Sequence, residues 1–198
     1  MEFLIHNFIS TEPLAVSIGF KEEDAKIITA KCVKDALSDS YCCGFLTHDG
    51  HIAAVRISQV MCRPKEGEDD ETDDGNLTEA ARKIVMVLSG LEKQIWGKVP
   101  LEVNRLITHH IICTSPNYRR LGLCQKLLSC DLDCQKAAGI QGSYTEATAI
   151  NSQKLFAKMG FTVLAENSYD SYKDKAGNRI FGEVQGTKGA QLVYKLYN

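Results

Sequence analysis

The chain has 198 residues, which is enough for one domain with a buried core. Apolar residues make up 44% of it and charged residues 24%, so fibrous and intrinsically disordered proteins are excluded. The net charge of −2 supplies no basic stripe for a nucleic acid, and no run of eighteen apolar residues predicts a membrane span. The start of the chain lacks the cationic-then-apolar layout of a secretion signal. We therefore expect a single cytoplasmic domain over residues 1–198, without nucleic-acid or membrane partners.

The N-terminal third contains helical patterns followed by strand patterns. Apolar residues of segment 3–8 have helical spacing, and Pro13 is expected to break that helix. Apolar residues on one side predict a second helix over residues 21–37. Two apolar runs joined by an Asp-Gly turn predict a β-hairpin over residues 41–62.

Residues 66–74 carry seven acidic side chains in nine positions. Because like charges repel, this segment predicts a solvated loop, with the attraction of a cationic ligand as the functional alternative. Thr78 then opens a further helix, which the apolar spacing extends to Trp96.

The second half alternates strands with helices, which predicts an α/β fold with a mixed sheet covered by helices on both faces. Residues 106–114 are rich in β-branched side chains, as a central strand usually is. Gly139 is expected to end the long helix of this half. The expected elements are a strand at 106–114, a turn at 115–120, a helix at 121–138, a strand at 140–147, a helix at 151–159, and two strands from residue 161 onward, the last at 189–197.

The eight cysteines raise the question of a disulfide framework or a zinc site. Cys42 and Cys43 are adjacent, and Cys130 and Cys134 share a predicted helix face without a second metal-type pair. Free cysteine often behaves as a small core residue. We expect reduced, mostly buried thiols, no structural disulfide and no metal.

The segment with the clearest chemistry is residues 119–124, between a predicted strand and the long helix. Backbone N–H groups at a helix start lack partners and lie at the positive end of the helix dipole, so they can hold a pyrophosphate. Gly122 lets phosphates approach the backbone, and Arg119 and Arg120 add charge-assisted donors. From these residues alone, an ordinary strand-to-helix turn with basic side chains is an equal alternative.

Two motifs, in order along the chain, resemble those of the acetyl-CoA-dependent N-acetyltransferase (GNAT) superfamily. Residues 115–124 resemble its acetyl-CoA-binding motif, with Arg119 and Gly122 at matching positions and Cys124 where Gly or Ala is usual. Residues 152–161 resemble its second motif, a helix that closes with Met-Gly-Phe. The resemblance implies the mixed GNAT sheet and acetyl-CoA as cosubstrate. It assigns these residues to the cosubstrate: Ile112, Cys113, Thr114, Arg119, Arg120, Leu121, Gly122, Leu123, Cys124 and Gln125.

Residues 8–14 resemble the Glu-Pro-Leu segment of the insect-type arylalkylamine N-acetyltransferases, which include dopamine N-acetyltransferase. The resemblance implies that Glu12 is the general base. It also implies that Thr148 and Ser152 stand where the family carries functional serines, with Ser152 as a candidate acid for the departing thiolate. His110 is a second candidate base, because an ordinary histidine pKa is near neutrality. The structural alternatives are a capping or surface role for Glu12, a packing role for Ser152 and a buried core histidine at His110.

The resemblance implies acetyl transfer to the primary amine of an arylalkylamine of the dopamine, serotonin, tyramine or octopamine class, by direct attack with general-base assistance. An aliphatic amine or polyamine acceptor, and a catalytically weak acyl-CoA-binding module, remain as alternatives. His109 is expected to point to the opposite face from His110. Met1 already lies at the family's first helix, so the family's first strand is expected to be missing. The oligomeric state is left open.

Overall fold

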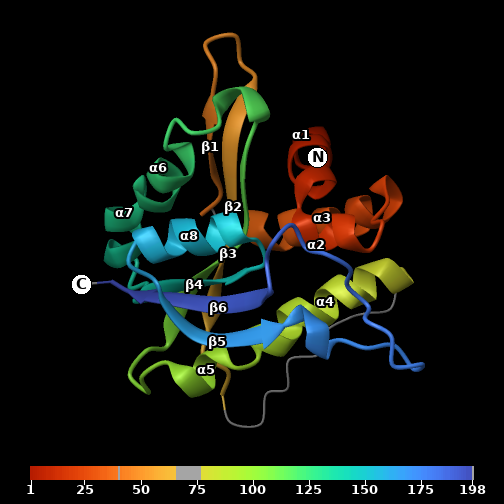
Figure 1. Cartoon of the computed structure of the whole chain (residues 1–198). Helices are drawn as coiled ribbons and strands as arrows, with labels where there is room; N and C mark the ends of the chain where they lie inside the picture. The colour runs from red at the N-terminus through yellow and green to blue at the C-terminus, as the bar shows by residue number, and fades with distance from the viewer. Residues whose placement is uncertain (40, 66–76, 198) are drawn as a thin grey trace.

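A six-stranded mixed sheet lies at the centre of the protein in a computed structural model, which describes residues 1–39, 41–65 and 77–197 (Figure 1). The strand order is β1-β2-β3-β4-β6-β5. β3 and β4 are parallel, and every other neighbouring pair is antiparallel. The strands are β1 (Cys43–Leu46), β2 (Ile52–Cys62), β3 (Arg105–Thr114), β4 (Gly142–Ala147), β5 (Thr162–Ser168) and β6 (Gly189–Leu196).

Helices cover both faces of the sheet, which confirms the predicted α/β class. Buried apolar side chains join α1, α3 and α4 to one face, and α6 and α8 to the other. The helices are α1 (Glu2–Asn7), α2 (Pro13–Ser17), α3 (Glu22–Leu37), α4 (Glu79–Glu92), α5 (Ile95–Lys98), α6 (Leu123–Ser129), α7 (Leu132–Ala137) and α8 (Ile150–Lys158). Short 3-10 turns are η1 (Ile9–Thr11), η2 (Pro116–Tyr118) and η3 (Tyr169–Ser171).

The predicted hairpin and central strand are confirmed. Residues 41–62 contain β1 and β2 joined by a tight turn, in which the Thr47 N–H donates to the His51 carbonyl at 2.8 Å. Gly50 in this turn has a φ of +83°, a conformation that favours glycine. The β-branched segment 106–114 forms β3, which pairs with a neighbour on each side.

The single helix expected over residues 121–138 is wrong, because the chain breaks there into α6 and α7. Arg56 of β2 is fully buried and donates to the Leu127 carbonyl. Its Nη1 and Nη2 atoms lie 2.9 and 2.5 Å from the two carboxylate oxygens of Asp131. In a continuous α-helix the Leu127 carbonyl would instead accept from the N–H of Asp131. Arg56 uses that acceptor, so the helix ends and restarts.

Two other helix boundaries differ from the expectation. Pro13 does more than end a helical pattern, because it occupies the first turn of α2, where a missing N–H costs nothing. The helix predicted to reach Trp96 ends at Glu92 and is followed by the short α5. The Trp96 carbonyl accepts from Arg63 Nη1 at 2.7 Å, which ties this region to the end of β2.

The cysteines are free thiols, but the expectation that most are buried is wrong, since only Cys113 is buried. Cys130 caps α6 and Cys134 lies in α7, so they do not share one helix. Within the described ranges, no group of three or more His, Cys, Asp or Glu side chains is placed to hold a metal ion.

The remaining expectations concern the family's first strand, the acidic segment and membrane spans. No strand precedes α1 in the part of the chain that the structure describes, and β1 has β2 as its described neighbour in the sheet. The acidic segment 66–74 lies outside the described residues. None of the described helices has the length and apolar character to cross a membrane.

Candidate functional site

The parallel strands β3 and β4 pair over a short stretch and then separate. Residues 106–108 pair with residues 142–144, and the Thr145 hydroxyl still donates to the His109 carbonyl at 2.7 Å. Beyond this point β3 continues to Thr114 in the ladder with β2. Figure 1 shows β3 rising with β2 while β4 runs across the molecule beside β6. The separation leaves one edge of β3 without a neighbouring strand among the described residues.

The open edge of β3 presents the backbone groups of Ile112 and Thr114. The Ser115 N–H donates to the Ala53 carbonyl of β2 at 2.9 Å, so the backbone groups of Ser115 face β2. Backbone groups alternate between the two edges along a strand. Those of Cys113 therefore face β2, and those of Ile112 and Thr114 face the gap. An extended ligand can pair with such an edge as an added strand.

The turn after β3 carries Arg119 and Arg120 and leads into α6 at Gly122; all three residues are exposed. Gly122 has a φ of +72°, which favours glycine. A Cβ atom there would meet no described atom within 4 Å except Gln125 Oε1 at 3.8 Å, so the backbone conformation rather than crowding requires glycine. The first N–H groups of α6, from Leu123 onward, have no acceptor within the helix. With the two arginines, they suit an anionic pyrophosphate.

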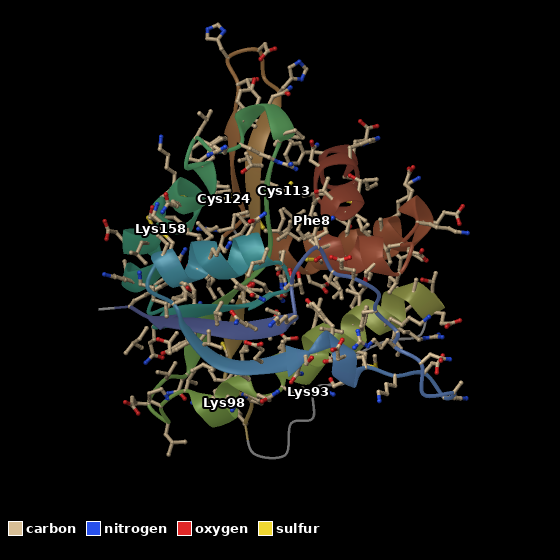
Figure 2. All side chains as sticks on the ribbon, in the orientation of Figure 1. Phe8, Lys93, Lys98, Cys113, Cys124 and Lys158 are labelled. Carbon is tan, nitrogen blue, oxygen red and sulfur yellow. The ribbon has the colours of Figure 1, made fainter. Side chains whose placement is uncertain are left out.

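Side chains connect the open edge of β3 to the start of α6. The Thr114 hydroxyl and the Cys124 thiol lie 3.2 Å apart, so Cys124, which departs from the family motif, fits between the strand and the helix. Gln125 Nε2 donates to the Met159 sulfur at 3.7 Å, which links α6 to the end of α8. Figure 2 shows Cys113 between Cys124 on one side and Phe8 on the other. The residues assigned to the cosubstrate, from Ile112 through the exposed Leu121 to Gln125, thus lie along one path.

A cavity of about 340 Å³ lies beside this path, between the sheet and helices α2, α3 and α4. All four sequence-predicted catalytic residues line it, together with Ile112 of the open strand edge. These four residues are Glu12, His110, Thr148 and Ser152. The structure therefore brings together side chains from the N-terminus, the central strand and the second motif.

Glu12 is the N-cap of α2, where Pro13 follows it in the first turn. Its Oε2 accepts from the Ala15 N–H at 2.6 Å, and its Oε1 accepts from the Thr148 hydroxyl at 2.8 Å. Burial raises the pKa of Glu12 above the ordinary carboxyl value, and these hydrogen bonds offset part of that rise. Glu12 is thus both a structural cap and a buried carboxylate in the cavity.

Thr148 and Ser152 make hydrogen bonds that fix the segment between β4 and α8. The Thr148 carbonyl accepts from the Tyr169 hydroxyl at 2.7 Å, which fixes the residue that bonds Glu12. The Ser152 hydroxyl donates to the Ala149 carbonyl at 2.7 Å and accepts from the Ala149 N–H at 3.3 Å. Ser152 therefore stabilises the first turn of α8 as well as lining the cavity.

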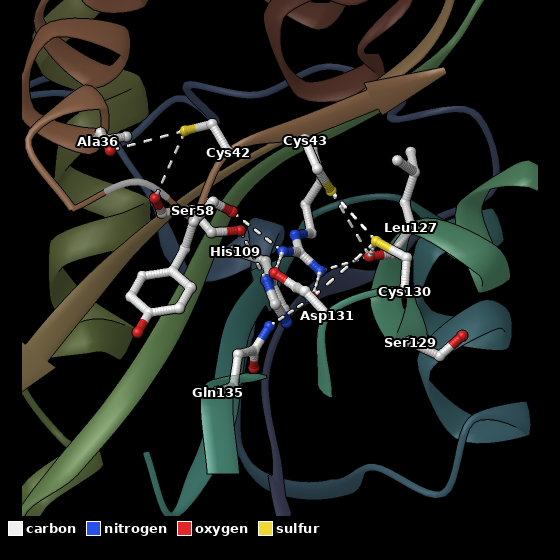
Figure 3. Close-up of polar contacts among 12 residues, drawn as sticks. Ala36, Cys42, Cys43, Ser58, His109, Leu127, Ser129, Cys130, Asp131 and Gln135 are labelled. Atoms are coloured by element: carbon white, nitrogen blue, oxygen red, sulfur yellow. Dashed lines mark hydrogen bonds and ion pairs between the residues drawn. The ribbon is translucent and has the colours of Figure 1, made fainter. Parts of the chain in front are cut away.

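The two adjacent histidines point to opposite faces of the sheet, as alternation predicts. His109 Nδ1 lies 2.9 Å from the Ser58 hydroxyl, on the face that also holds the Arg56 network (Figure 3). His110 Nε2 lies 3.1 Å from Gln59 Oε1, on the cavity side. Burial lowers the pKa of His110 to about 4, so this imidazole is neutral near pH 7.

Further acidic residues of the cavity were missed by the sequence analysis. Glu146 of β4 and Glu92 of α4 both line it, and Glu92 Oε1 accepts from the Tyr144 hydroxyl at 3.1 Å. Burial and the neighbouring Glu92 charge raise the pKa of Glu146 well above the ordinary carboxyl value. The available sequence signal was the alternation along β4, which places Glu146 on the same face as Thr148.

No family model and no curated protein matches the sequence significantly. Solved structures do match it over its full length. Arylalkylamine N-acetyltransferase 2 from Aedes aegypti has a TM-score of 0.83 and 22% identity, covering 100% of this chain and 92% of its own. The polyamine N-acetyltransferase of Drosophila melanogaster has a TM-score of 0.76 and 17% identity, covering 99% of this chain and 92% of its own.

A third similar structure is the C-terminal condensation domain of Ebony in complex with β-alanyl-dopamine. It has a TM-score of 0.74 and 15% identity, covering 98% of this chain and 91% of its own. At these identities the similarity establishes the fold. The chain has the mixed α/β fold of the N-acetyltransferases, as the sequence motifs predicted.

Proposed function

We propose that this chain transfers the acetyl group of acetyl-CoA to a primary amine, with Glu12 as the base that accepts the amine proton. The observation that carries the proposal is a shared cavity: Glu12, bonded to Thr148, lines it together with Ile112 of the open β3 edge. The fold supports the proposal, because amine N-acetyltransferases have it.

Glu12 suits the base role better than His110. A primary amine is almost wholly protonated at neutral pH, so the site must first bind the ammonium and then remove a proton. A carboxylate pairs with the ammonium, and the raised pKa of Glu12 makes it a stronger proton acceptor than an exposed carboxylate. The lowered pKa of His110, about 4, makes it a weaker one. The Ser152 hydroxyl, in the same cavity, is the proposed proton donor to the departing thiolate, and the proton that Glu12 accepted from the amine returns to the serine through solvent.

Backbone groups supply the remaining catalysis in this proposal. An N–H group of the open β3 edge, at Ile112 or Thr114, donates to the thioester oxygen and stabilises the negative charge that develops there. The start of α6, with Arg119 and Arg120, binds the pyrophosphate. Holding both reactants in one cavity removes much of the entropic cost of their encounter.

The first candidate acceptor is an arylalkylamine of the dopamine, serotonin, tyramine or octopamine class. Most of the cavity lining is apolar and can receive an aromatic ring. The apolar residues nearest in sequence to the proposed base lie between α1 and η1, in η1, in α2 and just after α2, and others come from α3 and α4. They include Phe8, Ile9, Leu14, Phe20, Ile28, Val85 and Leu88.

An aliphatic amine or polyamine is the second candidate acceptor. The observation that favours it is the acidic part of the lining, where Glu92, Glu146 and Asp35 join Glu12. Carboxylates attract additional positive charges, which arylalkylamines do not carry beyond their single ammonium.

The test is release of free CoA thiol from acetyl-CoA in the presence of tyramine, dopamine, serotonin, octopamine and spermidine. We expect turnover with at least one of these amines, and a loss of roughly a hundredfold in Glu12→Gln. Normal acetyl-CoA binding with no turnover on any amine would contradict the proposal and favour an acyl-CoA-binding module. Turnover that is unchanged in Glu12→Gln would contradict the assignment of the base.

A further inference from the structure

Glu146 has a buried carboxylate oxygen without a described partner. Its Oε1 atom is buried and makes no hydrogen bond, and the half-buried side chain lines the cavity. A buried polar group without a partner is costly, and an ionised carboxylate is more costly still. Thr29, fully buried in α3, also lines the cavity and has a hydroxyl without a described partner. Unsatisfied polar atoms that face a cavity point to a ligand that completes them.

The position of Glu146 relative to the proposed base is set by the pleat of β4. Side chains of residues 144 and 146 share one face of β4, because alternate residues point the same way, and Thr148 follows directly after the strand. At one end of this row Thr148 bonds Glu12, and at the other Tyr144 bonds Glu92. Glu146 lies between them in sequence, two positions before Thr148, which directly follows the last residue of β4.

The neighbouring carboxyl groups of Glu146 and Glu92 favour a bound cation. Glu92 and Glu146 are close enough for the Glu92 charge to raise the pKa of Glu146. Lys31 also lines the cavity, while His110 is neutral near pH 7 because burial lowers its pKa to about 4. Burial and the Glu92 charge favour the protonated form of Glu146; a positive group placed beside it favours the carboxylate instead and forms charge-assisted hydrogen bonds with it.

We propose that Glu146, with Glu92 beside it, forms a second cation subsite for the far end of the acceptor, and that the preferred acceptor is an aliphatic diamine. The nitrogen to be acetylated lies at Glu12 and Thr148, and the second ammonium lies at Glu146. The two nitrogens of a diamine are joined by a flexible chain, so the second ammonium can lie at Glu146 while the first lies at Glu12. This inference rests on the proposed acetyl transfer, and it selects the second candidate acceptor over the first.

The decisive comparison uses two ligands of equal length that differ in one charge: 1,5-diaminopentane and pentylamine. Binding of each is measured by calorimetry in the presence of CoA, for the wild type, for Glu146→Gln and for Glu183→Gln. Glu183 is exposed and lies outside the cavity, so its variant makes the same chemical change at a neutral place. Tyramine is measured in parallel as the arylalkylamine.

We expect the wild type to bind the diamine about tenfold or more tightly than pentylamine, the factor of one charge-assisted hydrogen bond. Glu146→Gln should remove this advantage and leave pentylamine binding within about twofold, while Glu183→Gln should change neither. Equal affinities for the two ligands in the wild type overturn the inference, and so does a Glu146→Gln variant that keeps the diamine advantage or weakens both ligands equally. Tyramine binding more tightly than the diamine also overturns it.

Release of free CoA thiol with the same amines separates this inference from the proposed function. If the diamine binds through Glu146 but no amine is acetylated, the proposed acetyl transfer fails while the subsite stands. If amines are acetylated without a diamine preference, the acetyl transfer stands and the subsite fails. Because the wild-type comparison needs no variant, a Glu146→Gln protein that failed to fold would not prevent the test.

Discussion

Replacing Glu12 by Gln separates its two structural roles from its proposed chemical one. In the wild type the Ala15 N–H donates to Glu12 Oε2 at 2.6 Å. Glutamine has the same length and keeps an oxygen that can accept this hydrogen bond. Its amide can also bond the Thr148 hydroxyl, which can rotate to accept. The substitution therefore keeps the cap of α2 and the bond to β4, and it removes the charge and the capacity to accept a proton.

Glu12→Ala is the matched structural control. It deletes the N-cap, a loss of about 1–2 kcal/mol, and the bond to Thr148, a further loss of about 1 kcal/mol. We expect Glu12→Ala to unfold at lower denaturant concentration than the wild type, and Glu12→Gln to unfold close to it. Both variants should lose roughly a hundredfold in turnover, the usual range for a missing general base. A loss in the alanine variant alone would mean that Glu12 acts through α2 rather than through its proton.

The assay is release of free CoA thiol across a pH series. Glu12 must be ionised to accept a proton, and burial raises its pKa above 4.5. The wild-type rate should therefore fall as pH drops through a value above 4.5, and this acid limb should be absent in Glu12→Gln. His110→Gln should keep the limb, because burial lowers the pKa of His110 to about 4. Acetyl-CoA affinity should stay near normal in Glu12→Gln. If that variant keeps its rate and its acid limb while His110→Gln loses them, then His110 is the base.

Three further outcomes are expected. Gly122→Glu should abolish acetyl-CoA binding in calorimetry, because a φ of +72° strains any side chain and a carboxylate repels the pyrophosphate; unchanged affinity would mean that the cosubstrate lies elsewhere. Thiol titration of freshly prepared, denatured, non-reduced protein should count eight free cysteines, and a count of six or fewer would contradict the free thiols. Burial and the Glu92 charge raise the pKa of Glu146 to about 8, so the folded protein holds a proton that the unfolded chain releases above about pH 4.5. The free energy of unfolding therefore falls as pH rises from about 4.5 to about 8. Glu146→Gln removes this loss, so it should raise the free energy of unfolding at about pH 9 by on the order of 1–3 kcal/mol, with little change at about pH 4. Equal effects at both pH values would contradict this prediction.

Local patterns in the sequence were sufficient for the elements and for part of the site. The β-branched run of residues 106–114 predicts β3, and the strand-turn-helix pattern after it predicts a helix start within two residues of the observed start of α6. The motif around Glu12 predicts a residue that does line the cavity. For β3 and α6 the decisive information lies within about ten neighbouring residues, where backbone preference and side-chain spacing act directly, whereas Glu12 was implied by the family resemblance.

Long-range contacts decided the features that the sequence analysis missed. The break between α6 and α7 depends on Arg56, seventy-one positions before Leu127, whose carbonyl it takes from the helix. Nothing in the apolar spacing of residues 121–138 indicates that Arg56 will take this carbonyl, so the spacing predicts an uninterrupted helix.

The sequence by itself determined the α/β class and the strand-turn-helix segment with its basic residues, because propensity, turn chemistry and apolar spacing are local properties. Only the tertiary structure decided that Glu12 meets Thr148, one hundred and thirty-six positions away, and that Glu92 and Glu146 face the same cavity. Their pKa shifts follow from burial and from neighbouring charges, and both depend on which distant segments fold against each other. A carboxylate that looks like any surface acid in the sequence acquires its chemistry from the low-dielectric cavity that the fold builds around it.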